Sequence, residues 1–214
     1  KMSDLLGPSR GKDEKISQKH KDIACSVQKV YEDALFNILS HLNKLYPTQI
    51  NLCLAGGCAQ NSLANGKITT NTNFEKVWIQ PAAGDSGGAL GAALTIANMH
   101  SNEKRNVMVS PALGISYSNK EIYDILEKTE LSLFNRLFID DEDQLTDYIA
   151  QLLVQGKVIG FFHGAFEWGP RALGNRSIIV DPRLDNMKDL LNRKIKKRES
   201  FRPFAPSVLK DKVH

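Results

Sequence analysis

The first hundred residues alternate helical and strand-like patterns, and this order constrains the fold more than any other feature of the sequence. Residues 17–46 repeat apolar side chains at three- and four-residue steps, which predicts an amphipathic helix that Pro47 ends. QINLCLAGG, residues 49–57, predicts a buried strand that runs into a glycine turn, and FEKVWIQP, residues 74–81, predicts a second strand. A helix is predicted after each strand, so the order indicates an α/β layer arrangement.

The helices predicted in this half differ in their side chains and in how they end. AQNSLANGKI, residues 59–68, predicts a helix that stops at Asn65-Gly66, whereas ALGAALTIANMH, residues 89–100, predicts a helix of small residues that allows close packing. The apolar stripe of the long helix consists of Ile23, Val27, Val30, Ala34, Leu35, Ile38, Leu42 and Leu45.

The polar stretch HSNEKRN, residues 100–106, lacks periodicity and predicts a linker between two domains, 1–105 and 106–214. The second domain is predicted to contain a Ser118-capped helix and a helix from Asp141 to Gln155. Two strands, KVIGFFH and SIIVDP, flank a glycine-rich loop, and the basic helix NMKDLLNRKIKKR follows. The second domain is therefore also expected to mix helices and strands.

Composition excludes several classes of protein. With 42% hydrophobic and 24% charged residues in 214, the chain is typical of a globular protein, and a net charge of +4 does not indicate nucleic acid. No apolar run approaches the ~20 residues that a membrane span needs. The opening is polar rather than a signal peptide, so we expect a cytoplasmic location. Cys53 and Cys58 have no matching Cys/His pair, which argues against zinc.

The segment LAGGCAQN, residues 54–61, predicts either a nucleotide site or a tight turn without a ligand. A glycine pair between a strand and a helix lets a ligand touch the backbone, and a helix N-terminus attracts anions. Asp85 lies in AAGDSGG, at the carboxyl end of the second predicted strand. Ligands of open α/β sheets bind at such strand ends, so this carboxylate is a candidate metal ligand, or else it caps the next helix.

The glycine-rich loop of the second domain holds two arginines, Arg171 and Arg176, between residues that restrict the backbone. Arginine binds phosphate and carboxylate groups through bidentate, charge-assisted bonds, so the loop predicts an anion site. Convergence on one anion requires that the loop and the basic helix fold together. The basic residues that would then converge are Arg171, Arg176, Arg183, Lys194, Arg198 and Arg202. For Lys188, Lys196 and Lys197 a solvated helix face is favoured, and His163 is interpreted as structural.

The sequences GFFHGAFEWGPRALGNRSIIVDPR and KKRESFRPFAPSVL closely resemble the carboxyl-terminal domain of the O-carbamoyltransferases that modify antibiotics and nodulation factors. NLCLAGGCAQNSLANGKI and VWIQPAAGDSGGALGAAL resemble the end of the first domain of the same enzymes. That domain is similar to the actin/Hsp70-like ATPase fold and to the tRNA threonylcarbamoyladenosine synthesis protein, and the second is similar to the YrdC fold. The resemblance runs from about Leu5 to Leu209.

The resemblance implies a two-step reaction. The YrdC-like domain makes a carbamoyl-adenylate from carbamoyl phosphate and ATP, and the first domain passes the carbamoyl group to a hydroxyl of a small-molecule or glycan acceptor. It further implies three groups of site residues: Arg171, Arg176, Lys194, Arg198 and Arg202 for the phosphates; Gly56, Gly57 and Asn61 for the adenylate; and Asp85 as one ligand of a divalent metal ion, Fe or Mg. A homodimer is kept open, and neither a membrane nor nucleic acid is expected as a partner.

The chain departs from the family in one respect. These enzymes carry a His-x-x-x-His metal pair in an amino-terminal half, and no two histidines here have that spacing. We therefore expect a fragment, the last part of the first domain and the start of the second, that is inactive alone. Two other classes stay open: a sugar-kinase-like ATPase, and a non-catalytic module that binds phosphate or nucleic acid.

Overall fold

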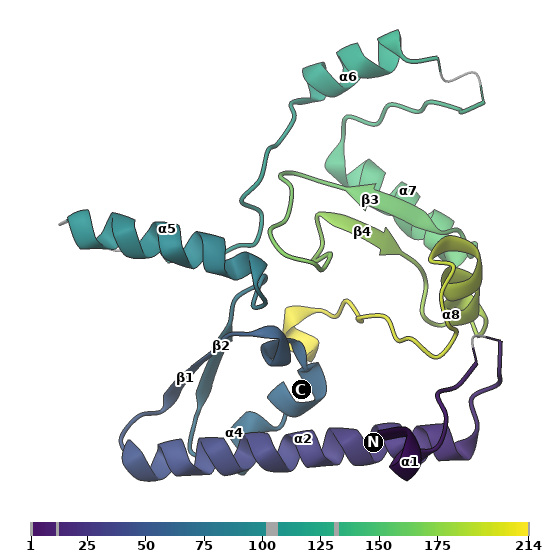
Figure 1. Ribbon diagram of the computed structural model, residues 1–214. Coiled ribbons are helices and arrows are strands. Elements are labelled where there is room, and N and C mark those ends of the chain that lie inside the picture. Colours follow the sequence, from purple (N-terminus) through teal and green to yellow (C-terminus); the bar gives the residue numbers. More distant parts are fainter. Residues whose placement is uncertain (1, 12, 102–106, 131–132, 214) are drawn as a thin grey trace. The chain divides into compact units, whose positions relative to one another are not determined.

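The computed structural model describes residues 2–11, 13–101, 107–130 and 133–213, and the chain divides into two compact units, Lys1–Asn106 and Val107–His214 (Figure 1). Most of the predicted linker, residues 102–106, lies outside the described residues. Each unit combines helices with a two-stranded sheet, which confirms the predicted α/β class. No helix within the described ranges is long and apolar enough to cross a membrane.

The first unit follows the predicted order, with one exception. The helix predicted within residues 59–68 stops at Asn65-Gly66 as expected, but its start is interrupted. The Asn61 side chain accepts a hydrogen bond from the Ala64 amide (3.1 Å) and starts a new turn after η1. In chain order the elements are α1 (Met2–Leu6), α2 (Gln18–Leu45), β1 (Asn51–Leu54), the 3-10 turn η1 (Gly57–Gln60), α3 (Ser62–Asn65), α4 (Ile68–Asn71), β2 (Lys76–Ile79) and α5 (Ser86–His100).

The long helix α2 confirms the prediction for residues 17–46, but only part of its apolar stripe is buried. Leu39, which is 2% exposed, forms a core with Leu52, Ile68 and Phe74, and Leu35, Phe36 and Leu42 pack against it. In contrast, Val27, Val30, Ile38 and Leu45 are more than half exposed. The sheet that α2 packs on has two strands, which are too few to cover the whole stripe.

The strands β1 and β2 pair in parallel, with Asn51 opposite Lys76 and Leu54 opposite Ile79. Parallel strands need a crossover connection, which η1, α3 and α4 supply. Both strands therefore end at the same edge of the sheet, and the segments that follow them leave this edge together.

The described residues of the second unit form three α-helices, and two of these are capped as predicted. Ser118 and Glu121 form a capping box at the start of α6, and Asp141 accepts from the Gln144 amide (2.8 Å) at the start of α7. Gly156, at φ +78°, ends α7. The elements are α6 (Asn119–Lys128), α7 (Glu142–Val154), β3 (Ile159–Phe162), β4 (Arg176–Ile179), α8 (Met187–Leu190), the π-helical turn η2 (Leu191–Ile195) and the 3-10 turn η3 (Lys210–Lys212).

The strands β3 and β4 form an antiparallel hairpin, with Ile159 opposite Ile179 and Phe162 opposite Arg176. Residues 163–175 connect the two strands, and we call this connection together with Arg176, the first residue of β4, the arginine loop. A turn after β4 is fixed by Asp181, whose buried carboxylate accepts from the Arg183 backbone amide and from two nitrogens of its guanidinium. These bonds lower the pKa of the Asp181 carboxyl from 3.8 to about 2.

Replacing Ile68 by Ala should destabilise the first unit. Ile68 is 0% exposed within the core around Leu39, so the truncation leaves a cavity that costs about 2–5 kcal/mol. Ile38→Ala is the matched control, since Ile38 is 59% exposed on α2. Chemical denaturation measures both free energies of unfolding, and equal losses in the two variants would contradict this assignment of the core.

Asp181→Asn should remove a contribution to stability that depends on pH. The pKa of Asp181 is lower in the folded protein than its ordinary 3.8, so its carboxylate stabilises the fold above about pH 4. This contribution is lost as the pH falls toward 2, because both states then bind the proton. The difference in unfolding free energy between wild type and variant, measured by denaturation from pH 7 to pH 2, should shrink in that window. Asp185→Asn, at an exposed carboxylate, is the control.

Candidate nucleotide and anion sites

The glycine turn after β1 lies beside the loop after β2. The two parallel strands end at one edge, and the Gly56 amide donates a hydrogen bond to the Ala83 carbonyl (2.7 Å) across it. Gly84 lies close to Gln60 from the other segment, since a Cβ on Gly84 would meet the Gln60 amide nitrogen at 3.4 Å. The carboxyl edge of the parallel pair thus brings the two predicted glycine segments together, where open α/β sheets bind their ligands.

Both glycines of the turn leave their backbone open. Gly56 has φ +96°, which other residues rarely adopt. A Cβ at Gly56 or Gly57 would meet no atom within 4 Å, so no neighbouring side chain covers this stretch. A ligand can therefore approach the main chain here.

Side chains of α2 fix the position of the turn. The Gln28 and Asn61 amides exchange two hydrogen bonds, of 2.9 and 3.3 Å, and the Tyr31 hydroxyl donates to the Cys58 carbonyl at 3.1 Å. Burial, followed by the nearby Cys58, raises the pKa of the Tyr31 hydroxyl, so this donor keeps its proton. The Asn61 side chain, predicted to hold an adenylate, is occupied by these bonds and by the Ala64 amide.

An ion pair between the buried Glu32 and the partly exposed Lys67 completes this network. Glu32 is 6% exposed and accepts hydrogen bonds from Gln28 (2.9 Å) and from the Lys67 ammonium (2.7 and 2.8 Å). The bond from Gln28, and then that from Lys67, lower the pKa of the Glu32 carboxyl, which favours the charged form. A helix, the glycine turn and the residues after α3 are thereby joined through polar side chains.

Asp85 occupies the N-cap position of α5, but its exposed side chain makes no capping hydrogen bond. In the part of the chain that the structure describes, no group of three or more His, Cys, Asp or Glu side chains lies close enough to hold a metal. A catalytic metal site draws on several protein ligands. Asp85 by itself does not make one, and its role as a ligand stays a prediction.

The arginine loop is held by the buried carboxylate of Glu167, a residue that sequence reasoning did not single out. Its Oε1 accepts from the amides of Leu173 (2.8 Å) and Asn175 (3.1 Å), and its Oε2 accepts from the Arg176 amide (3.2 Å). The side chain is 1% exposed. Three backbone bonds to one buried carboxylate replace the ladder of hydrogen bonds that an irregular loop lacks.

The two arginines of this loop are in different situations. The Arg176 guanidinium donates to the Glu167 carbonyl (2.6 Å) and lies over the Phe166 ring, 4.9 Å from its centroid. Its Nε is 4.0 Å from the Glu167 carboxylate. Arg171 is exposed and makes no hydrogen bond or ion pair with any described residue. Arg176 is thus part of the loop's framework, whereas the Arg171 guanidinium is available to a ligand.

The basic residues after β4 also differ in whether their side chains bond to buried parts of the protein or lie exposed. Arg198 donates to the side chain of the fully buried Asn192 (2.7 Å) and lies over the Phe204 ring at 4.7 Å. Asn192 also donates to the carbonyls of Ser200 and Arg202, which fixes the segment around them. Arg202 forms an exposed ion pair with Glu199 (2.9 Å), and Lys194 is exposed.

No hydrogen bond or ion pair among the described residues joins Arg171 and Arg176 to Lys194, Arg198 and Arg202, so the convergence of all five on one anion stays a prediction. The arginine loop joins β3 to β4 at one end of the hairpin, while α8 and η2 follow the other end of β4 (Figure 1). Arg171 and Arg176 therefore belong to one local arrangement, and Lys194, Arg198 and Arg202 to another.

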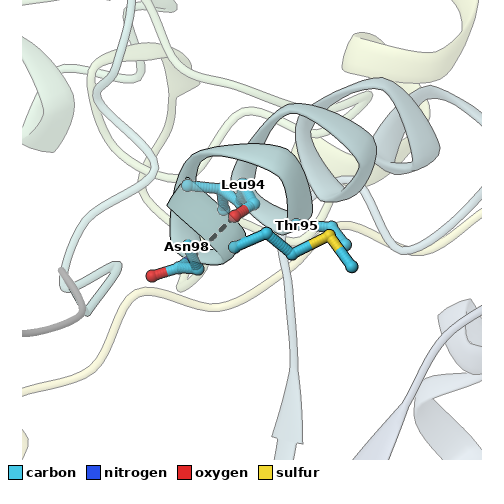
Figure 2. Close-up of a pocket in the computed structure, with 4 residues that line it drawn as sticks. Leu94, Thr95 and Asn98 are labelled. Carbon is cyan, nitrogen blue, oxygen red and sulfur yellow. Dashed lines mark hydrogen bonds between the residues drawn. The ribbon is translucent and has the colours of Figure 1, made fainter. Parts of the chain in front are cut away.

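Two cavities in the described residues lie away from the predicted site residues. A hollow of about 280 Å³ on α5 is lined by Leu94, Thr95, Asn98 and Met99; Figure 2 shows the hydrogen bond from Asn98 to the Leu94 carbonyl (2.7 Å) within it. A larger apolar hollow of about 720 Å³ lies between α6, α7 and β3, where Ile122, Phe138 and Ile149 are among its walls. Neither contains a basic residue that was predicted to bind an anion.

Both parts of the chain that hold the candidate sites match known protein families. Residues 1–94 match the family described as "Carbamoyltransferase N-terminus", and residues 150–214 match "Carbamoyltransferase C-terminus". The chain is 42% identical to an uncharacterized protein of Synechocystis, with all of this chain and 35% of that protein covered. It is 38% identical to nodulation protein NolO of Bradyrhizobium diazoefficiens (97% and 39% covered) and 35% identical to nodulation protein U of Rhizobium tropici (77% and 26%).

The chain spans about a third of the length of these relatives. The glycine turn and Asp85 lie in the part that matches the N-terminal description, and the arginine loop lies in the part that matches the C-terminal one. The suspected resemblance is confirmed: the chain belongs to the carbamoyltransferase family.

Proposed function

We propose that the complete protein carrying this sequence is an O-carbamoyltransferase. It would take carbamoyl phosphate and ATP, form a carbamoyl-adenylate, and transfer the carbamoyl group to a hydroxyl of a small-molecule or glycan acceptor. The observation that carries this proposal is the arginine loop, which presents the unpaired Arg171 guanidinium from a fixed backbone within the family's C-terminal region.

The second unit would bind carbamoyl phosphate, within a YrdC-like domain. A guanidinium offers a planar fork of N–H donors that fits two phosphate oxygens at once. The loop also holds two donors, Arg176 Nε and Trp168 Nε1, that are buried and have no hydrogen-bond partner among the described residues. Such unpaired donors favour an anionic ligand. Arg198, Arg202 and Lys194 would contribute from the segment after β4.

The first unit would hold the adenylate at the carboxyl edge of β1 and β2, within an actin/Hsp70-like domain. The open backbone at Gly56 and Gly57 supports this role, because a phosphate or ribose can approach the main chain closely. The bonds that occupy the Asn61 side chain support a role in shaping the turn rather than in binding the nucleotide directly.

Asp85 would be one ligand of a divalent ion whose other ligands come from elsewhere in the complete protein. Its exposed carboxylate beside the glycine turn supports this location. A carboxylate-bound ion there would supply Lewis acidity toward the carbamoyl oxygen or the acceptor hydroxyl.

The rival functions are separated by one assay. A sugar-kinase-like ATPase would hydrolyse ATP without carbamoyl phosphate, and a non-catalytic module would bind anions without turnover. Carbamoyl phosphate-dependent conversion of ATP by the purified complete protein supports the proposal, and its absence with metal and acceptor extracts supplied would overturn it.

Arg171→Ala should weaken the binding of carbamoyl phosphate. The substitution removes a charge-assisted contact worth about 1.5–3 kcal/mol, while the loop keeps its bonds to Glu167. Arg136→Ala is the control, because Arg136 is paired with Glu127 (3.0 Å) away from the loop. Calorimetry measures both dissociation constants, and an unchanged value for Arg171→Ala would remove this residue from the site.

Gly57→Val should abolish ATP-dependent carbamoyl transfer and leave the melting temperature nearly unchanged. A side chain at Gly57 meets no neighbouring atom, so it obstructs a ligand without straining the fold. Gly56→Ala is the contrasting variant, since φ +96° makes any side chain there costly to stability. Thermal melting and a transfer assay are compared for both. Normal transfer by Gly57→Val would mean that the glycines form only a turn.

A further inference from the structure

Glu167 is the one carboxylate buried in the arginine loop, although the loop belongs to a candidate anion site. A negative charge beside such a site opposes anion binding by simple electrostatics. Its side chain is 1% exposed and its nearest cationic group, Arg176, is a neighbour from the same loop. The presence of this charge therefore requires a different explanation.

The hydrogen bonds of Glu167 supply that explanation. All three amides that its carboxylate accepts, those of Leu173, Asn175 and Arg176, belong to the stretch directly after Arg171. On the other side of Arg171, Gly169 and Pro170 restrict the backbone, with Gly169 at φ +107°. The main chain that carries Arg171 is thus fixed at both ends while its side chain stays unpaired.

Arg176 balances the charge of this carboxylate. Its guanidinium bonds to the Glu167 carbonyl at 2.6 Å and stacks on Phe166, so its own position is fixed by the residues it neutralises. Arg176 and Glu167 together form a neutral framework, and the net positive charge of the loop remains on Arg171.

We propose that Glu167 is the positioning residue of the anion site: its carboxylate orders residues 173–176 so that Arg171 is held where it meets the phosphate. This inference rests on the proposed function for the identity of the ligand. The ordering itself concerns only the loop, and it can be tested without a ligand.

Two substitutions separate geometry from charge. Glu167→Asp keeps the charge but shortens the side chain by one methylene, so the carboxylate no longer reaches all three amides. Glu167→Gln makes the loop more positive by one unit and leaves a single carbonyl oxygen for three donors. A purely electrostatic role predicts unchanged binding for Asp and tighter binding for Gln. A positioning role predicts weaker binding for both, by roughly ten- to hundredfold, because a small misplacement of a binding group is costly.

The experiment measures the dissociation constant of carbamoyl phosphate by calorimetry in the complete protein, well below the melting temperature. Glu127→Gln is the matched control, since it removes an equal charge next to Arg136 on the exposed surface. Weaker binding in both Glu167 variants and unchanged binding in the control support the proposal. Unchanged or tighter binding in Glu167→Gln overturns it, and so does a variant that is less stable but binds normally.

Hydrogen exchange at individual amides tests the ordering separately. The amides of Leu173, Asn175 and Arg176 should be protected in the wild type and lose protection in Glu167→Asp, while the α7 amides keep theirs. Fast exchange of all three in the wild type overturns the inference even where a variant does not fold. If the wild type shows this protection but does not bind carbamoyl phosphate, the proposed function fails and the ordering role of Glu167 stands.

Discussion

Irregular loops cannot satisfy their own backbone N–H and C=O groups, and the candidate sites of this protein depend on how that constraint is met. Strands and helices pair these groups internally, whereas a loop inside a folded unit needs donors and acceptors from side chains. In the arginine loop the acceptor is the Glu167 carboxylate. At the glycine turn the α2 side chains of Gln28 and Tyr31 hold the segment, and Asn192 holds the chain around Arg202.

This arrangement gives similar residues different tasks. Arg171 and Arg176 both follow a glycine or proline framework in the sequence, yet one has a free guanidinium and the other neutralises a buried carboxylate. Arg198 likewise bonds to Asn192 and stacks on Phe204, whereas Arg202 makes an exposed pair. A basic side chain near a site is thus evidence for a ligand contact only where the protein itself does not already pair with it.

The sequence predicted the parts of the structure that follow from local physics. The helices after Ser118 and Asp141 were found because caps and apolar periodicity are local signals. β1, β2 and β3 lie within the predicted segments, and β4 begins at Arg176, one residue before the predicted strand SIIVDP. The helix predicted to stop at Asn65-Gly66 ends there, but it starts only at Ser62, since the Asn61 side chain competes for the backbone before it. Leu39, the most buried residue of α2, was outside the predicted stripe, because burial depends on where the sheet lies.

The site was predicted less completely than the fold. The motifs identified Arg171 and the glycine pair, because the residues that restrict their backbones are adjacent in sequence. Glu167, Gln28 and Asn192 were missed. Each bonds to a segment six or more residues away, and the residues next to each of them form no motif that marks it. The grouping of all five basic residues depends on tertiary contacts between the loop and the segment after β4, which local sequence does not encode, and it stays a prediction.

The bonds of Glu167 have a consequence for how this loop can change during evolution. They go to backbone amides, which every residue except proline provides, and not to the side chains of Leu173 or Asn175. The shape of the segment is therefore encoded at position 167, outside the segment itself. Leu173, which is 54% exposed, can be exchanged without altering that shape, whereas Gly174 at φ +128° cannot. The loop can thus acquire new contacts to a ligand while the geometry that presents Arg171 is inherited unchanged.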